Sequence, residues 1–301
     1  MWSRSIKSTL CAFPMKGGRM HVKHLLHVLF PLMLLCLCAS CHYVKTPSEK
    51  NMSDVLAELD SMINQFAKES DTLLDEDSDW ESDTLIANCY DRALTAISHK
   101  YGEESEEMLA CLKYAADNLS DDDTPFSQKV QYGYSCYEKA LSISMKMYGN
   151  TSIAVGNCYA DLVYASGQDS DNAKLYADSA LAILVPKCGN SSKEVAYVYI
   201  NLGDSYLKNS YVIYHAAAQS QMLNDSDDFS VEDYEEINSI LELSLANYRK
   251  ASDIYKELSE KDMDEYKELT ESLKEDIQNI EDEIKQNNEI LVRLKSNTTS
   301  E

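Results

Sequence analysis

The chain has little positive charge. Its 301 residues include 27 Lys and Arg against 51 Asp and Glu, which gives a net charge of −24. This balance excludes a nucleic-acid-binding surface, because phosphate recognition requires clustered basic side chains. With 44% hydrophobic residues the chain is not a disordered acidic tail. We therefore expect a folded, acidic protein with a core of ordinary size.

The sequence also lacks an apolar run long enough to cross a bilayer. Its longest run, Leu25–Cys38, has 14 residues, whereas a spanning helix needs about 20. Residues 1–40 carry five basic side chains and no acidic ones, so residues 41–301 have a net charge of −29. Basic residues, a short apolar run and then small residues are the order typical of an export signal.

The end of this leader, Cys38-Ala39-Ser40-Cys41, resembles a bacterial lipobox. The resemblance implies that Cys41 is lipidated, becomes the mature N-terminus and anchors the protein in a membrane. An ordinary cleaved signal with an incidental cysteine, and an uncleaved anchor, remain the alternatives. Translation from Met20 would give a leader of more usual length.

His42 follows Cys41, and no acidic run comes directly after it. By resemblance to lipoproteins of bacteria with two membranes, this indicates sorting to the outer membrane of the cell envelope. The body would face the periplasm or be exposed on the cell surface.

Signatures of catalysis are missing. Residues 41–301 contain only three histidines, His42, His99 and His215, and no glycine-rich phosphate loop or nucleophile motif. Two acidic segments, 75–80 and 225–228, have part of a calcium-loop pattern, but Trp80 stands where the loop requires glycine. We expect solvated acidic linkers, no metal site, no cofactor and no enzymatic activity.

An internal repeat is the strongest signal in the chain. Three helical segments begin with Tyr90, Tyr137 and Ala177 and share an x-x-Ala-Leu pattern. They end at Gly102, Gly149 and Gly189, which recur at similar intervals along the chain. A second apolar stretch with helical spacing follows each glycine, so each repeat consists of two helices.

Within these units, Tyr-x-x-Ala-Leu resembles the second helix of a tetratricopeptide repeat, and residues 201–206 resemble its first helix. Units of about 42 residues that end in Tyr-Gly resemble the kinesin light chain subtype. The resemblance covers about residues 84–258. It implies an all-α, helical-hairpin solenoid that binds another protein or a peptide.

The predicted organisation has four parts. They are a lipoprotein-type signal peptide (1–40), an N-terminal tether (41–52), a solenoid of about four units (53–258), and a C-terminal helix with a short polar tail (259–301). Acidic insertions are expected near 69–83 and 209–235, the second of them of uncertain structure. The first predicted helices span 53–68 and 84–101.

The last predicted helix, 262–296, has apolar residues at spacings of mostly three and four, including Tyr266, Leu269 and Leu273. We expect it to cap the end of the solenoid, since a terminal repeat needs a polar outer cover. Dimerisation as a short coiled coil is the alternative, with Asn287 at a core position.

Besides Cys41, five cysteines follow the leader, and the positions of four of them match the repeat. Cys89 and Cys136 precede the repeat tyrosine, whereas Cys111 and Cys158 both come nine residues after the repeat glycine. Equivalent positions in successive units favour small buried thiols in the core. A single disulfide between neighbouring helices remains possible in an exported protein.

If the tetratricopeptide frame holds, the first helix of each unit lines a groove. The groove positions implied by the resemblance are Lys113, Asp117, Asn157, Tyr164, Tyr197, Asp204 and Lys208. Aromatic and polar side chains together suit an extended peptide. The expected function is a lipid-anchored, non-catalytic binder of an envelope protein. The alternatives are a carbohydrate- or solute-binding lipoprotein that serves an outer-membrane transporter, and a structural subunit that self-associates through its last helix.

Overall fold

The computed structural model describes residues 49–70, 79–120, 127–224, 229–260 and 263–298. Glu49–Glu301 form one compact unit. The leader and Cys41 lie outside the described residues, as do positions 75–78 and 225–228 of the two acidic segments. Among the described residues, no helix is both long and apolar enough to span a bilayer.

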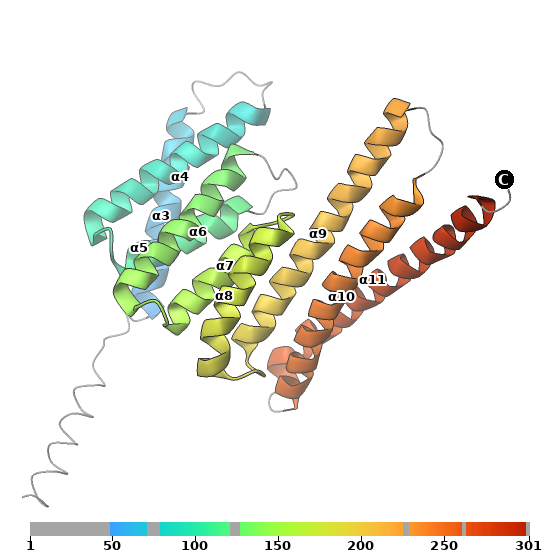
Figure 1. The fold of residues 1–301 in the computed structure, drawn as a ribbon. Helices are drawn as coiled ribbons and strands as arrows, with labels where there is room; N and C mark the ends of the chain where they lie inside the picture. Colours follow the sequence, from blue (N-terminus) through green and yellow to red (C-terminus); the bar gives the residue numbers. More distant parts are fainter. Residues whose placement is uncertain (1–48, 71–78, 121–126, 225–228, 261–262, 299–301) are drawn as a thin grey trace, which may run out of the picture. The chain divides into compact units, whose positions relative to one another are not determined.

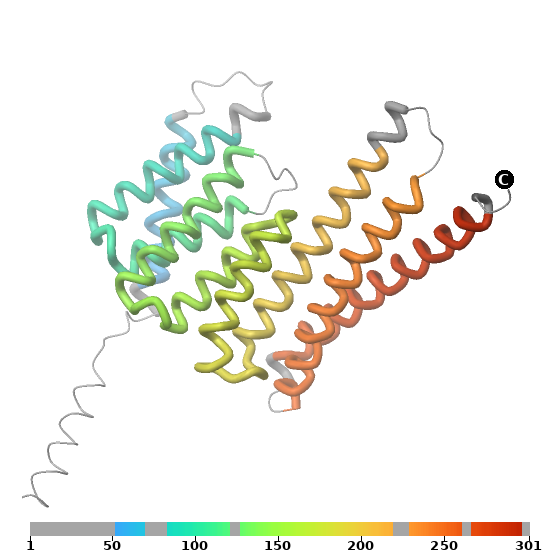
Figure 2. Tube along the Cα trace, in the orientation of Figure 1, coloured from blue at the N-terminus to red at the C-terminus, as the bar shows by residue number. Residues whose placement is uncertain are grey.

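The described residues form nine helices and no strands, which confirms the predicted all-α class (Figure 1). The helices are α3 (Glu49–Ser70), α4 (Asp79–Tyr101), α5 (Glu106–Ser120), α6 (Gln128–Tyr148), α7 (Ile153–Ala165), α8 (Ser170–Cys188), α9 (Lys193–Asn224), α10 (Val231–Ser259) and α11 (Met263–Thr298). Each of the first eight pairs with its neighbour along the chain, which gives the hairpins α3/α4, α5/α6, α7/α8 and α9/α10. The traced chain in Figure 2 shows these hairpins succeeding one another, with α11 last.

The repeat glycines stop the second helix of each of the first three hairpins. Gly102, Gly149 and Gly189 have φ angles of 99°, 82° and 89°, and each amide donates to the carbonyl oxygen four residues earlier. Residues with a Cβ adopt such angles only at a cost, so glycine is favoured at this position.

A serine three residues after each glycine then starts the next hairpin. The hydroxyl oxygens of Ser105, Ser152 and Ser192 accept a hydrogen bond from the backbone N–H three residues further on, at 3.0, 3.3 and 3.3 Å. This is helix N-capping, which satisfies a backbone donor that the helix leaves unpaired. The short segment Gly-x-x-Ser thus encodes the whole turn between successive units.

The apolar side chains form two clusters that meet at α7. One cluster joins α3 to α6 and takes in Leu162 of α7, whereas the other joins α7 to α11. Tyr159 and Tyr176 pack against both clusters, with ring centroids 6.2 Å apart. The Tyr176 hydroxyl also lies 2.8 Å from that of Tyr134 on α6. These tyrosines fill the junction between the second and third hairpins.

The predicted insertion at 209–235 is absent as a separate segment. Helix α9 continues to Asn224, and α10 already begins at Val231, behind a Ser230–Asp233 capping box. Residues 209–224 contain neither glycine nor proline, so nothing in their sequence stops a helix that packing has already started. The fourth hairpin therefore has much longer helices than the others, which reach 23 residues at most.

Helix α11 packs along α10 with the apolar face that the sequence predicts. Leu273, Ile280 and Leu291 are buried there. Leu269, which the sequence placed in this face, is 43% exposed. The side of α11 that faces α10 recurs at alternating steps of four and three residues, and the step of four from Tyr266 reaches Thr270, not Leu269.

Two hydrogen bonds fix the alignment of α10 and α11. The amide of Asn287 donates to Asn238 at 3.0 Å, and that of Asn238 donates to Asn288 at 3.1 Å. Asparagine pairs within an apolar seam favour one register over its neighbours. The seam that could have formed a coiled-coil dimer is thus occupied by α10, and α11 caps the last hairpin.

We predict that tryptophan at two close helix contacts strongly destabilises the fold. A Cβ added to Gly203 would lie 3.2 Å from the ring of Tyr248, and Ala140 is 1% exposed. Gly203→Trp and Ala140→Trp should each cost about 3 kcal/mol or more, because no space exists for the indole. Thermal unfolding followed by circular dichroism measures this.

Leu175→Trp is the matched control, since Leu175 lies on a helix but is 61% exposed. Its transition should resemble that of the native protein. A full cooperative transition at the native temperature in Gly203→Trp or Ala140→Trp would contradict the close contacts.

Candidate functional site

The predicted groove positions lie on the first helices of three successive hairpins. Lys113 and Asp117 are on α5, Asn157 and Tyr164 on α7, and Tyr197, Asp204 and Lys208 on α9. The structure brings six of the seven into two clusters of side chains, one between α5, α6, α7 and α9 and the other between α7, α9 and α10. Asn157 is half-buried on α7 and joins neither cluster.

The first cluster is centred on an ion pair that crosses from α5 to α7. The Nζ atom of Lys113 lies 2.7 Å from a carboxylate oxygen of Asp161, a residue that is 8% exposed. One turn further along α5, Asp117 accepts a hydrogen bond from the hydroxyl of Tyr137 on α6. Burial raises the pKa of the Tyr197 hydroxyl on α9. The nearby charges of Asp161 and Asp117 raise it further, whereas that of Lys113 lowers it.

Burial controls the protonation of this cluster. It raises the pKa of Asp161, and the ammonium of Lys113 opposes that rise. Burial also acts to lower the pKa of Lys113, but the carboxylate of Asp161 outweighs it and the pKa is raised overall. The pKa of the Tyr137 hydroxyl is raised by burial and by its hydrogen bond to Asp117. Each group thus depends on its neighbour to remain buried.

The second cluster is built around Asp204. Its carboxylate accepts a hydrogen bond from the Tyr248 hydroxyl of α10. Burial raises the pKa of Asp204, and the Tyr248 hydroxyl and the Lys208 ammonium counteract that rise. The Lys208 Nζ also lies 5.4 Å from the ring centroid of Tyr164 on α7, a cation–π distance. This contact links the third and fourth hairpins.

These contacts divide the predicted groove residues into two kinds. Lys113, Asp117 and Asp204 have partners within the fold, so their side chains hold neighbouring helices together. Tyr197 is 41% exposed and Lys208 is also exposed. Of the predicted positions on α9, Tyr197 and Lys208 are therefore the exposed ones.

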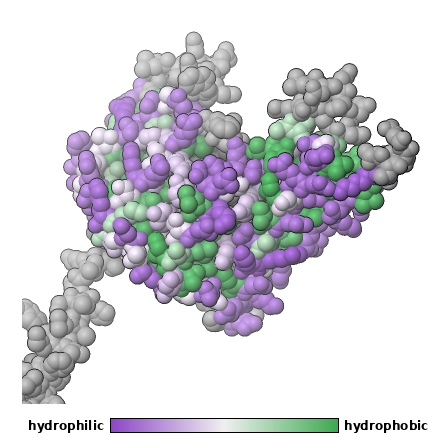
Figure 3. Space-filling view, in the orientation of Figure 1, coloured by the Kyte–Doolittle hydropathy of each residue, from purple (hydrophilic) through white to green (hydrophobic). Residues whose placement is uncertain are grey.

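The exposed row on α9 continues beyond the positions that the sequence suggested. Tyr211 is 46% exposed, Val212 is 39% exposed, and His215 is exposed as well. Whole turns of α9 counted from Tyr197 bring Lys208 to the third turn and His215 to the fifth. Tyr211 and Val212 lie on either side of the fourth turn. All five side chains therefore share one face of the helix. Figure 3 shows hydrophobic and hydrophilic atoms interspersed over this face of the molecule.

The sequence carried a signal for this extension, since Tyr197, Asp204, Tyr211 and His215 repeat at helical intervals. Because an insertion was expected at 209–235, the helix predicted from the sequence did not extend to Tyr211 and His215. We refer to Tyr197, Lys208, Tyr211, Val212 and His215 as the α9 row.

A hollow of about 390 Å³ lies between α4, α5 and α6, apart from the α9 row. Its apolar wall includes Leu94, Met108 and Leu112. Charged groups at its rim are engaged with one another: the Tyr132 hydroxyl donates to Asp91 at 2.9 Å, and Lys146 pairs with Glu104 at 2.7 Å. The sequence gave no indication of this hollow, which depends on the separation of two helices.

The cysteines of the described residues are all free thiols. Cys89, Cys111, Cys136 and Cys158 are buried, and Cys188 is partly exposed. Burial raises the pKa of Cys111 and Cys136 to about 12 in each case. These positions fit the predicted packing role, because a protonated buried thiol is a poor nucleophile. No three His, Cys, Asp or Glu side chains in the described ranges are placed to hold a metal ion.

No protein-family model matches the chain, and no curated protein matches it. The solved structures that match include the crystal structure of BtubC (BKLC) from P. vanneervenii, at 16% identity over 78% of this chain and 92% of that chain. The TM-score is 0.27, so this likeness carries no argument about function or helix placement. The helical-hairpin architecture rests on the helix pairs described above.

We predict that Lys113→Met destabilises the protein by about 2 kcal/mol at neutral pH, because it leaves the buried Asp161 carboxylate without its cation. The deficit should shrink as the pH falls through the raised pKa of Asp161, since a protonated carboxyl needs no cation. It should be fully present above that pKa. Urea unfolding at a series of pH values between about 8 and 5 measures both effects.

Lys146→Met is the control, since the Lys146–Glu104 pair is more than half exposed on both sides. Little change is expected there. A loss for Lys113→Met no larger than that of the control, or one independent of pH, would contradict the buried pair.

Proposed function

We propose that this protein is a non-catalytic scaffold that binds an extended segment of another protein along the first helices of its hairpins. The observation that carries the proposal is the α9 row, in which exposed side chains from Tyr197 to His215 share one face of a single helix. At about 1.5 Å per residue the row is roughly 27 Å long, enough to contact about eight residues of an extended peptide.

The chemistry of the α9 row suits peptide recognition. Tyr197 and Tyr211 expose aromatic surface with a hydroxyl at its end, and such side chains lose little conformational entropy on binding. Lys208 is held near the ring of Tyr164 before any ligand arrives. A partly fixed side chain costs less to order than a free one, so the row is partly preorganised.

The supporting contacts keep this surface in place. The Lys113–Asp161 pair joins α5 to α7, and the Asn201 side chain of α9 donates to the carbonyl oxygen of Ala160 on α7 at 3.0 Å. Neighbouring hairpins are thereby tied at their first helices, where the peptide would lie.

The anchor is a separate part of the proposal. A lipidated Cys41 would hold the body at the outer membrane, facing the periplasm or the cell surface. Confinement to a membrane raises the effective concentration toward other envelope proteins without adding a contact. The net charge of −29 on residues 41–301 favours a partner segment that carries basic residues.

The groove is tested with peptides selected from a displayed random library against residues 49–301. The triple variant Tyr197→Ala, Lys208→Ala, Tyr211→Ala should lower the affinity of the selected peptides about tenfold or more, because truncated anchor residues commonly cost over about 1.4 kcal/mol. Fluorescence anisotropy with a labelled peptide measures the change.

The matched control is Tyr148→Ala with Lys174→Ala. Tyr148 has the same exposed fraction as Tyr197, 41%, but lies at the end of α6. Its affinity should stay within about twofold of the native value, and circular dichroism should show equal helix content in all three proteins. Equal binding by the triple variant, or failure to select any peptide, would overturn the groove and direct attention to carbohydrate ligands.

The anchor is tested by Cys41→Ala in cells that export the full chain. We expect loss of lipid labelling and release of the protein from the membrane fraction, because one sulfur carries the first acyl group. Cys188→Ala serves as the control, since it removes a partly exposed thiol of the body. Persistent membrane association of Cys41→Ala would contradict the lipid anchor while leaving the groove untouched.

A further inference from the structure

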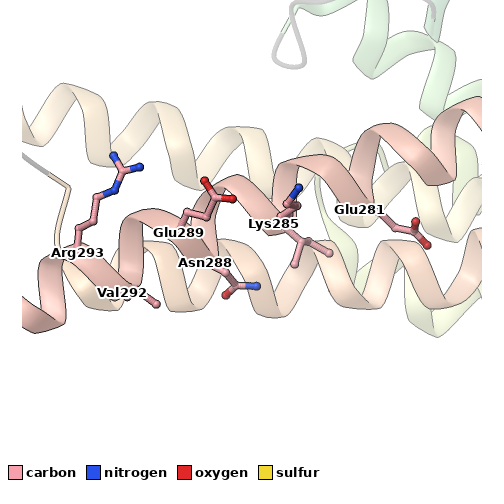
Figure 4. A pocket seen from close by; sticks show the side chains of 7 residues that line it. Glu281, Lys285, Asn288, Glu289, Val292 and Arg293 are labelled. Atoms are coloured by element: carbon pink, nitrogen blue, oxygen red, sulfur yellow. The ribbon is translucent and has the colours of Figure 1, made fainter.

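The outer face of α11 carries a regular row of alternating charges. Glu281, Lys285, Glu289 and Arg293 follow one another at intervals of four residues, so they form a single ridge along the helix. They border a shallow groove together with Asn288 and Val292 (Figure 4). We call these four residues the α11 charge row.

This row is largely unused within the described part of the chain. Glu281 pairs with Arg249 of α10 at 2.6 Å, but Lys285, Glu289 and Arg293 are exposed and make no ion pair there. Val292 beside them is 69% exposed, the largest fraction of any large apolar side chain described. Helix α11 is the last described helix, and the helix that packs along it is α10.

The order of charges makes the row complementary to itself, and one arrangement gives the most contacts between opposite charges. Glu281 and Arg293 are each six residues from Asn287, and Lys285 and Glu289 are each two residues from it. When two copies run antiparallel with a two-fold axis at the level of Asn287, Glu281 meets the partner's Arg293 and Lys285 meets the partner's Glu289. The symmetry repeats both pairs, which gives four contacts between opposite charges.

Other arrangements give fewer contacts between opposite charges or bring like charges together. A parallel pair shifted by one turn keeps three such contacts, and an antiparallel pair shifted by two turns keeps two. A parallel pair in register places every charge opposite itself. An antiparallel pair shifted by one turn places Lys285 against Lys285 or Glu289 against Glu289. In the favoured register, Val292 also approaches the level of the partner's Ile284 to within two residues, roughly 3 Å. Ile284 is half-buried at the edge of the same groove.

We propose that the α11 charge row is a homodimer interface, in which two copies of this chain pair antiparallel through their last helices. This face is distinct from the apolar seam of α11, which packs on α10. The inference does not depend on the peptide groove, because α9 contributes nothing to it. Single exposed ion pairs are weak and are screened by salt, so the dimer should weaken as the salt concentration rises. Anchoring both copies in one membrane would favour the dimer by raising their effective concentration.

The test exchanges the charges of the central pair. Residues 49–301 form a compact unit, and sedimentation equilibrium in low salt gives its dimer dissociation constant. Lys285→Glu alone and Glu289→Lys alone should each weaken dimerisation about tenfold or more, because each places like charges opposite one another twice. An equimolar mixture of the two variants should associate with about the native affinity, since their rows are complementary to each other.

Contacts within one helix cannot produce that rescue, because each variant keeps its own mismatched row after mixing. The control is Lys267→Glu, the same charge change on the same side of α11. Lys267 lies 20 residues from Asn287, well outside the paired positions 281–293, so the dissociation constant should remain within about twofold of the native value.

Three outcomes would overturn the proposal. They are a native protein that stays monomeric at several hundred micromolar in low salt, a dimer that both single variants retain, and a mixture that remains monomeric. Raising the salt to about 1 M should weaken the native dimer by shortening the range of the charges. Peptide binding by the same proteins reports on the groove separately, so failure of one proposal is distinguishable from failure of the other.

Discussion

No hairpin of this chain buries its apolar side chains without its neighbours, and the rest of the structure depends on that constraint. Leu162 of α7 belongs to the core formed by α3 to α6, whereas Ala160 and Val163 of the same helix belong to the core that extends to α11. A pair of helices has two apolar faces, one for its partner and one for the next hairpin. Stacking is therefore required for stability, and it places equivalent helices in a row.

The turns keep this stacking regular. A glycine with positive φ ends one hairpin, and a serine three residues later begins the next, so successive hairpins start with the same geometry. Side chains about one repeat apart consequently meet across units, as Tyr132 does with Asp91 and Asn201 does with the Ala160 carbonyl. The polar contacts that support the groove follow from this periodicity.

The last hairpin departs from the pattern, and both proposed binding surfaces result from that departure. Helices α9 and α10 have 32 and 29 residues, against 13 and 19 in the preceding hairpin. The far part of α9 keeps Tyr211 and Val212 exposed as a result. Helix α11 covers the long α10 with its apolar seam and leaves a charged ridge on the side away from α10.

The sequence alone determined the helical class, the two-helix unit, the turn glycines and the apolar seam of α11, because each follows from local spacing. It also led to seven residues on the first helices of three hairpins, six of which lie in two clusters of side chains. It did not show that Lys113, Asp117 and Asp204 have partners within the fold, since Asp161, Tyr137 and Tyr248 lie on other helices, far away along the chain. The continuation of α9, the exclusion of Leu269 from the seam and the exposure of the α11 charge row were likewise decided by tertiary packing, because burial is set by what one helix meets on another.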